Sequence, residues 1–492
     1  MNLVNDRIKR FFIAVLISLN AMVVESSAES VRPRVIISTD MKGYDIDRDL
    51  DDIASMIRFL VYSNEFDVEG LIAARACAGA DNNGAATTRP DIIHDLVDRY
   101  ADVFPTLKKH ASGFPTPESL HHVVKEGTQG DPLQPCWKAE NDMTAVGDGK
   151  STEASDWIIE VVDREDKRPV WFLVWGKSLD LAQALFDIRQ SRGEEKARDF
   201  VSKLRVYDVW GQCECGAWIA HHFPGVFYIR SWLQVKGMSN EPGDTSNMQD
   251  PWIHQNIIAN HGRLGEVYPS REHQAGNVEG DSPSFLYLIH NGLSDPAHPE
   301  WGSWGGRMTA QPVKNVSAIG DPPIDREWRD FWMYDDVPDK IWDPKLPRKL
   351  SLRVPVSRWR DAFQRDFAAR MDWCVSDFAS ANHPPKVVVD GDATREVLTR
   401  RVRPGESVTL SAEESSDPDG DRLQFQWWRY QDADNLKNEI FLDQSPDGRV
   451  RFAVPKESKA GEVHLILEVT DDGMPGLTRY RRVIVRVSEG DD

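Results

Sequence analysis

The pattern of apolar positions divides the chain into two parts with different periods. In the first part, short apolar runs alternate with segments in which apolar residues recur at i, i+3, i+4 and i+7, the spacing of an amphipathic helix. The runs predict strands at 34–38, 68–73, 170–174 and 204–210, and the helical spacing predicts helices at 53–61, 91–100 and 179–186. Strands that alternate with helices predict an α/β fold with a mainly parallel sheet and helices on both faces.

Beyond the prolines at 384 and 385 the apolar period changes to two. Residues 423–427, 463–469 and 483–487 alternate apolar and polar side chains, and Asp-, Pro- and Gly-rich turns separate these runs. The pattern predicts a small all-β, antiparallel sandwich at 385–492. Because two consecutive prolines cannot continue a helix, the α/β domain is expected to occupy residues 32–382.

The first 28 residues have the pattern of a signal peptide. Arg7, Lys9 and Arg10 precede the mostly apolar stretch Phe11–Val24, and small residues end at Ala28. An uncleaved N-terminal anchor is the alternative, although the apolar stretch is short for a membrane span. We therefore expect export to the periplasm or the extracellular space, and no transmembrane segment in the mature chain.

The amino-acid composition limits the kinds of ligand and metal that the protein is expected to bind. The formal net charge is −20, which disfavours a nucleic-acid polymer but permits an uncharged sugar or nucleoside. The five cysteines are too few for a disulfide scaffold in a chain of this length, and their odd number leaves at least one unpaired. Cys213 and Cys215 could be a metal pair, but no further ligands stand at the spacing that zinc sites use.

Several carboxylates follow the first predicted strand. Asp40 lies just after that strand, and Asp51 and Asp52 begin the next helix. A strand end and the following helix start lie close together, so these carboxylates would repel one another unless a cation binds. Oxygen ligands of this type favour Ca²⁺ or Mg²⁺. The alternative is that Asp51 and Asp52 only cap the helix and interact with its dipole.

The same residues resemble a segment of a known protein family. Thr39-Asp40, Gly43 and Asp51-Asp52, followed by an amphipathic helix, resemble the aspartate-rich opening of nucleoside hydrolases. The chain as a whole resembles bacterial exported proteins described as cellulose-binding, which have a nucleoside-hydrolase-like domain and a C-terminal immunoglobulin-like β-sandwich. The resemblance covers about residues 32–488, and its matching stretches are 59–67, 69–73, 175–176, 181–185, 279–288, 291–293, 304–307 and 359–364.

The resemblance implies roles for individual residues. Asp40 would bind Ca²⁺ and act catalytically by orienting the attacking water, and Asp52 would be a second metal ligand. Asp51 would hold a ribose hydroxyl. The backbone carbonyl of Leu179 and the carboxylate of Asp281 would complete the metal site.

The sequence departs from the nucleoside hydrolases at the general acid. Gly280 stands where those enzymes have a histidine, and the neighbouring Glu279 is the candidate replacement. Asp180 replaces an amide or hydroxyl side chain, and together with Trp175 it is a candidate for substrate binding. Further candidates for the general acid are His222, His254, His273 and His290, and the spacing of the sequence does not favour any one of them.

Two functions follow from these features. The first is a Ca²⁺-dependent hydrolase of N-glycosyl bonds in a nucleoside or related glycoside, since such bonds break through an oxocarbenium-like state that a metal-oriented water can attack. The alternative is a non-catalytic protein that binds cellulose or another polysaccharide with a degenerate hydrolase fold. An O-glycosidase would need two opposed carboxylates at a defined separation.

Two further features have both a functional and a structural interpretation. The chain has 17 tryptophans, of which Trp301, Trp304, Trp328, Trp332 and Trp342 could line a saccharide groove, although packing of loops is favoured. In the second domain, Asp417, Asp419 and Asp421 with Asp471 or Asp472 could hold Ca²⁺, although a simple Asp-rich turn is favoured.

Overall fold

The computed structural model describes residues 32–44, 50–77, 86–129, 143–270, 279–313, 331–341 and 349–488. Within this range, residues from Pro33 onward belong to one compact unit. No helix of the described ranges is both long and apolar enough to cross a membrane. The predicted signal peptide, Cys136, His273, Trp328 and Trp342 lie outside the described residues.

An eight-stranded sheet forms the first part of the chain, and it confirms the predicted α/β class. Its neighbouring strands are parallel except at one edge, where β9 and β10 pair antiparallel. In spatial order the strands are β5 (Val124–Glu126), β2 (Asp67–Ala73), β1 (Arg34–Thr39), β6 (Val170–Val174), β7 (Leu204–Val209), β8 (Phe227–Ser231), β10 (Phe331–Asp336) and β9 (Met308–Val313).

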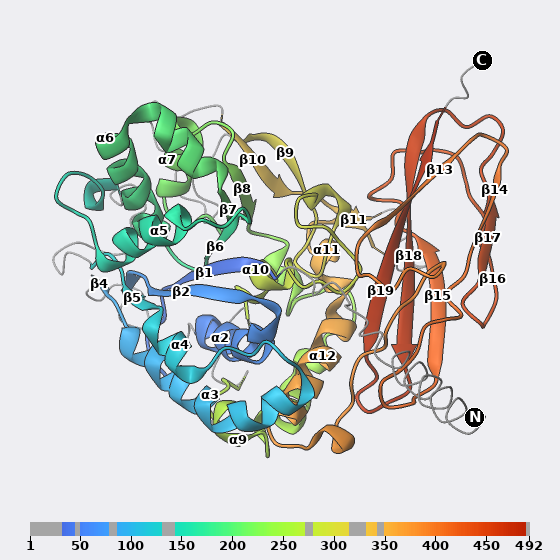
Figure 1. Ribbon diagram of the computed structural model, residues 1–492, viewed down its shortest axis with the longest axis horizontal. Helices are drawn as coiled ribbons and strands as arrows, with labels where there is room; N and C mark the ends of the chain where they lie inside the picture. Colours follow the sequence, from blue (N-terminus) through green and yellow to red (C-terminus); the bar gives the residue numbers. More distant parts are fainter. Residues whose placement is uncertain are drawn as a thin grey trace, which may run out of the picture. The chain divides into compact units, whose positions relative to one another are not determined.

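Helices cover both faces of this sheet because its central strands are apolar on both sides. In β1, Val35 and Ile37 face one core cluster and Ile36 faces the other. Figure 1 shows α5, α6 and α7 on one face and α2 and α3 on the other. The helices are α2 (Asp51–Tyr62), α3 (Pro90–His110), α4 (Pro117–His122), α5 (Glu153–Asp163), α6 (Leu179–Ser202), α7 (Cys215–His222), α8 (Asp250–Ile253), α9 (Gly262–Glu266), α10 (Ser282–Leu286), α11 (Val354–Ser357) and α12 (Arg360–Trp373).

The strand order places a crevice at the centre of the sheet. From β1 the chain goes first to β2 on one side and later to β6 on the other, so the direction of the winding reverses between β1 and β6. In open parallel sheets, ligands bind beyond the carboxyl ends of the strands at such a reversal. Asp40 directly follows β1, and Trp175 and Gly176 directly follow β6.

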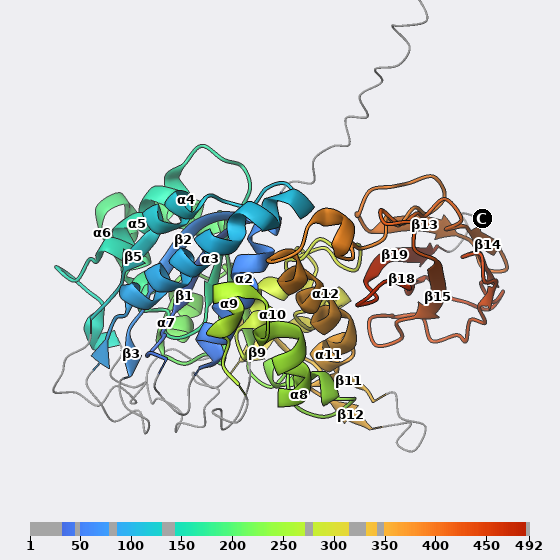
Figure 2. The same ribbon diagram turned by 90° about the horizontal axis from the view of Figure 1, so that it is seen from below.

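The second part is a β-sandwich, as expected, with two sheets that Figures 1 and 2 show as two layers. The prediction that it is antiparallel throughout is wrong in one place, because β13 pairs parallel to β19. These two strands are far apart in the chain, so no short turn forces them to be antiparallel. The sheets are β13 (Leu398–Val402), β19 (Thr478–Val487), β18 (Gly461–Asp471) and β15 (Leu423–Arg429), and β14 (Ser407–Leu410), β17 (Val450–Ala453) and β16 (Asp443–Gln444); two small pairs elsewhere are β3 (Ala76–Cys77) with β4 (Ala86–Thr87) and β11 (Asp339–Lys340) with β12 (Leu350–Ser351).

The sandwich shares a hydrophobic core with the helices of the first part. Tyr430, Ile466 and Tyr480 of the sandwich belong to the same buried cluster as Trp304 and Trp359. Backbone hydrogen bonds extend the contact, since Tyr480 N donates to Asn291 O and Arg482 N donates to Gly292 O. The two parts are therefore joined by side-chain packing as well as by the linker.

Candidate metal and substrate site

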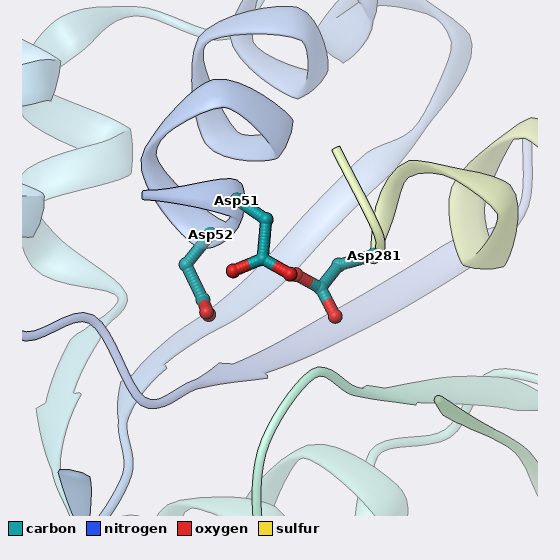
Figure 3. Close-up of side chains that lie close together, drawn as sticks. All are labelled: Asp51, Asp52 and Asp281. Carbon is teal, nitrogen blue, oxygen red and sulfur yellow. The ribbon is translucent and has the colours of Figure 1, made fainter. Parts of the chain in front are cut away.

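Aspartates from two distant segments meet at the carboxyl edge of the sheet. Asp51 and Asp52 begin α2, and Asp281 immediately precedes α10. One carboxylate oxygen of each lies within 4.8 Å of the others. Figure 3 shows the side chains of Asp51 and Asp281 directed toward one another, with Asp52 beside them. The structure thus brings together three of the four predicted carboxylates, from positions about 230 residues apart in the chain.

The fourth carboxylate, Asp40, belongs to the same electrostatic group. The pKa of Asp40 is raised to about 6, chiefly by burial; Lys42 and Lys177 act to lower it, and the charge of Asp51 acts to raise it. The backbone passes close to this side chain at Gly176, where a Cβ atom would lie 2.5 Å from Asp40 Cγ. A glycine after β6 therefore makes room for the carboxylate that follows β1.

Burial and mutual repulsion act on the whole group. Burial, followed by the charges of Asp40 and Asp51, holds the pKa of Asp52 well above its usual value. Burial also holds the pKa of Asp281 well above its usual value, followed by repulsion from Asp52, Asp51 and Asp40. Four close carboxylates in a protein interior are stable as anions only with compensating positive charge.

The unsatisfied oxygens fit a hard cation. Asp51 Oδ1 and Asp281 Oδ2 are buried and accept no hydrogen bond. Asp52 is oriented by the hydroxyl of Thr39, which donates to its Oδ1. Buried carboxylate oxygens without donors are costly, and oxygen-only donor sets of this kind suit Ca²⁺ or Mg²⁺. The residues present therefore fit the divalent cation that the sequence predicts.

Glu279, the predicted replacement acid, is held in a closed network. Its side chain has no exposed surface, and its Oε2 lies 2.6 Å from Arg58 Nε. Tyr268 donates its hydroxyl proton to Glu279 Oε1 at 2.5 Å, and Ser282 donates to Oε2 at 3.3 Å. These contacts occupy both carboxylate oxygens of Glu279 with protein groups. The geometry therefore favours a role in positioning Asp281, and a catalytic role for Glu279 stays a prediction.

The substrate-binding candidates are engaged with other protein groups. The indole of Trp175 is buried and donates to Ser284 Oγ at 2.8 Å, so its faces are covered by the protein. Asp180 Oδ1 accepts from the backbone and hydroxyl of Thr128 and from the hydroxyl of Thr152. Asp180 Oδ2 accepts no hydrogen bond. Substrate binding by either residue stays a prediction.

The remaining candidates lie in several different settings. Leu179 is the first residue of α6 and is buried, and the role of its carbonyl stays a prediction. His290 lies 3.5 Å from Glu396 of the sandwich, and His222 Nδ1 contacts Trp218 O. His254 is the first residue of a short π-helix and is exposed. None of these contacts involves the four aspartates.

Most of the described tryptophans of the Pro/Gly-rich region pack in the protein interior. Trp301 and Trp304 are buried, and Trp304 forms part of the core shared with the sandwich. Trp332 on β10 is 63% exposed and could contact a ligand. Among the described cysteines, Cys213, Cys215 and Cys374 are buried and form no disulfide.

Two basic residues near the site were not identified from the sequence. Lys42 acts electrostatically on Asp40, Asp51 and Asp52. Arg58 lies in the middle of α2 and is fully buried. Charged residues are ordinary in an amphipathic helix, so no signal in the sequence indicated that Arg58 is buried. Lys42 lies two residues after Asp40 in a loop, where the sequence likewise carries no signal.

The comparisons with known proteins agree with this architecture. Residues 34–308 match the family described as cellulose-binding Sde182, nucleoside hydrolase-like domain. Residues 407–487 match the C-terminal domain of cellulose-binding protein Sde0182. A search of curated proteins finds no match.

Two solved structures give a further comparison. One is a nucleoside hydrolase-related hypothetical protein from Saccharophagus degradans that is associated with carbohydrate metabolism; it is 34% identical, covers 93% of this chain and 100% of its own, and has a TM-score of 0.76. A mouse clustered protocadherin fragment, PcdhgC3 EC1-3, is 10% identical over 38% of this chain and 44% of its own, and its TM-score of 0.15 carries no argument. The chain therefore belongs to the family of cellulose-binding Sde182 proteins, with a nucleoside hydrolase-like domain followed by the Sde0182 C-terminal domain.

Proposed function

We propose that the protein is a Ca²⁺-dependent hydrolase of the N-glycosyl bond in a nucleoside or a related glycoside. The observation that carries the proposal is the meeting of Asp51, Asp52 and Asp281 at the carboxyl edge of a nucleoside hydrolase-like sheet. Two oxygens of this group are buried and accept no hydrogen bond. A purely structural helix cap would not need the third carboxylate from a segment so distant in the chain.

Each carboxylate has a proposed part in the reaction. Asp52 and Asp281 would hold the cation, with Asp51 Oδ1 and the carboxylate of Asp40 beside them. When bound, the cation would supply positive charge that acidifies a water molecule and orients sugar hydroxyls. Asp40 would accept the proton of the attacking water, and Asp51 would accept a hydrogen bond from a sugar hydroxyl. With a pKa of about 6, Asp40 would be mostly ionised at neutral pH, as a proton acceptor must be.

The protein offers no evident proton donor for the leaving group at the position where nucleoside hydrolases have a histidine. Gly280 has no side chain to donate a proton, and Glu279 is held as the partner of Arg58. Substrates whose leaving group departs without protonation by the enzyme would therefore react faster than substrates whose leaving group must be protonated. A panel that includes both kinds of leaving group tests this expectation.

The second candidate is a protein that binds cellulose or another polysaccharide without cleaving it. The family's cellulose-binding description and the engaged state of Glu279 favour it. In this case, the aspartate group would bind Ca²⁺ as a structural ion. The exposed ring of Trp332 is the described aromatic surface that a sugar could reach in the Pro/Gly-rich region.

The first experiment is a release assay with the purified mature protein. A panel of nucleosides is incubated with Ca²⁺, and the free base is measured for the wild type, Asp52→Asn and Asp91→Asn. Asp91 is an exposed carboxylate that pairs with Arg89 at 2.7 Å, so it is the matched control. We expect release by the wild type and the control, and loss of release in Asp52→Asn and after chelation.

The two candidates give different results in this assay. If no nucleoside releases base while calorimetry shows bound Ca²⁺, the hydrolase proposal is wrong for this substrate class. Sedimentation with insoluble cellulose then tests the second candidate. Binding that persists in Asp52→Asn and falls in Trp332→Ala would support it, and no sedimentation would remove it.

A further inference from the structure

A second acidic group lies in the β-sandwich, in the loop before β15. Asp417, Asp419 and Asp421 each place one carboxylate oxygen within 4.8 Å of the others. Asp417 Oδ1 accepts hydrogen bonds from the backbone of Asp419 at 2.8 Å and of Asp421 at 3.2 Å. These bonds alone describe an Asp-rich turn and do not require a ligand.

Asp471 is the separate observation that points to a ligand. It is the last residue of β18, it is only 3% exposed, and β-pairing places it opposite Leu423, two residues after Asp421. Its Oδ1 accepts from the side chain of Asn382 and from the backbone of Gly473 and Leu477. Its Oδ2 is buried and accepts no hydrogen bond. A buried carboxylate oxygen without a donor is unfavourable.

Asp417 has the same unsatisfied geometry. Asp417 Oδ2 is also buried and without a hydrogen-bond partner. Burial raises the pKa of Asp471, and the charge of Asp417 contributes to the rise. Burial, followed by the charges of Asp417, Asp472 and Asp419, raises the pKa of Asp421. Repelling carboxylates with unsatisfied buried oxygens are the environment that a hard cation stabilises.

We propose that Asp417, Asp421 and Asp471 bind a divalent cation of the Ca²⁺ type, in a site separate from that of the first domain. Asp472 is outside this set because its two oxygens accept from the backbone and side chain of Arg422. A surface pocket beside this loop is lined by Asn382, Asp421 and Gly473, among other residues. This proposal does not depend on the proposed hydrolase activity.

The site is coupled to the linker between the two parts of the chain. Asn382 donates to Asp471 Oδ1 at 2.8 Å, and the backbone of His383 donates to Asp419 Oδ2 at 2.7 Å. Gly473 leaves room for this arrangement, because a Cβ atom at that position would overlap the amide of Asn382. A cation held here would therefore fix the linker to the sandwich and raise the stability of the whole chain.

The test uses the chelator-treated, full-length mature protein titrated with Ca²⁺ by calorimetry. All variants carry Asp52→Asn so that the first site contributes as little as possible. Asp421→Asn is the main variant because no described hydrogen bond depends on its carboxylate, and Asp472→Asn is the matched control from the neighbouring turn. We expect Asp421→Asn to weaken Ca²⁺ binding in the sandwich by about tenfold or more, and Asp472→Asn to leave it unchanged.

Thermal unfolding gives an independent measurement. Ca²⁺ should raise the Tm of the Asp52→Asn and Asp52→Asn/Asp472→Asn proteins and have little effect on Asp52→Asn/Asp421→Asn. Asp417→Asn should behave like Asp421→Asn, provided that its far-UV circular dichroism matches the wild type. Equal Ca²⁺ affinity and equal Tm shifts in Asp421→Asn and Asp472→Asn would overturn the proposal. Absence of any Ca²⁺ binding by folded Asp52→Asn protein would also overturn it.

Discussion

At the scale of single residues, Gly176 decides whether Asp40 can occupy its place. The missing side chain of Gly176 leaves the space in which the Asp40 carboxylate lies, and an added Cβ would come 2.5 Å from Asp40 Cγ. Real Cβ atoms do not approach a neighbour so closely, so either the backbone after β6 or Asp40 would have to move. Asp40 is the side chain that can turn away at lower cost.

We therefore predict that Gly176→Ala weakens Ca²⁺ binding at the first site by about tenfold, equivalent to about 1.4 kcal/mol. The fold should be retained, with a loss of about 1–3 kcal/mol in the free energy of unfolding because of overpacking. Calorimetry with Ca²⁺ and urea denaturation measure the two effects. Gly216→Ala is the control, because its Cβ would lie 2.6 Å from the Tyr228 hydroxyl and not beside Asp40. Equal Ca²⁺ affinity in the two variants would contradict the prediction.

The sequence was informative about the acidic residues of the site and uninformative about their basic neighbours. Asp40, Asp51 and Asp52 follow one strand and begin one helix, so local order alone places them together. Asp281 is distant in sequence, and only the resemblance suggested it. Lys42 and Arg58 act through space on groups that the fold brings near, and no local pattern encodes that proximity.

At the scale of elements, the pair Arg58–Glu279 connects α2 to the turn before α10. Arg58 belongs to the helix that begins with Asp51 and Asp52, and Glu279 precedes Asp281 by two residues. Arg58 also donates to Phe363 O on α12 at 3.1 Å, so one guanidinium joins α2 to two other segments. The pair fixes the distance between the two elements that carry the carboxylates.

Glu279→Gln should therefore lower both the stability of the fold and the affinity for Ca²⁺. Leaving the buried Arg58 without its anionic partner costs about 3–5 kcal/mol, which urea denaturation measures. Glu69→Gln is the control, since Glu69 pairs with Arg34 at 2.5 Å on strands β2 and β1 and at the opposite end of β1 from Asp40. We expect this control to lose stability while it keeps its Ca²⁺ affinity. A positioning role for Glu279 is excluded if the two variants, both folded, bind Ca²⁺ equally.

The elements that the sequence predicted are those with a clear apolar period. The strands at 34–38 and 170–174 and the helix at 53–61 lie within β1, β6 and α2. Strand β8 was missed because Arg230, which is buried against Asp335 at 2.8 Å, interrupts its apolar run. Helix α3 was predicted too short, since it continues through Pro105, a residue that usually ends a helix.

At the scale of the whole molecule, Arg482 joins the sandwich to the first part of the chain. Its guanidinium donates to Leu293 O at 2.5 Å and to Gly302 O at 3.0 Å, and it contacts His464 Nδ1 at 2.9 Å. Because arginine has no acceptor, His464 Nδ1 must accept a hydrogen bond from the Arg482 guanidinium, which requires a neutral imidazole. Burial, followed by the charge of Arg482, lowers the pKa of His464 to about 2.

This histidine predicts a loss of stability in acid. The unfolded chain takes up a proton at His464 below pH 6.5, whereas the folded protein does not until pH falls to about 2. The stability that the neutral, buried His464 contributes is therefore fully present above pH 6.5. As the pH falls below 6.5, the free energy of unfolding decreases by about 1.4 kcal/mol per pH unit because of this residue. His464→Asn should show a shallower loss between pH 6 and 4 in urea denaturation. His254→Asn, which changes an exposed histidine, should keep the wild-type slope, and identical slopes in both variants would contradict the prediction.

The core shared by the two parts has a consequence for how this architecture can be inherited. Tyr430, Ile466 and Tyr480 fill space beside Trp304 and Trp359, so a sandwich taken from an unrelated protein would leave these rings uncovered. Recombination that exchanged the C-terminal segment alone would produce a chain with an exposed aromatic surface and a tendency to aggregate. The sandwich is thus not a domain that can be exchanged freely between proteins. The sequences of the two domains are expected to change together at the residues of the shared core.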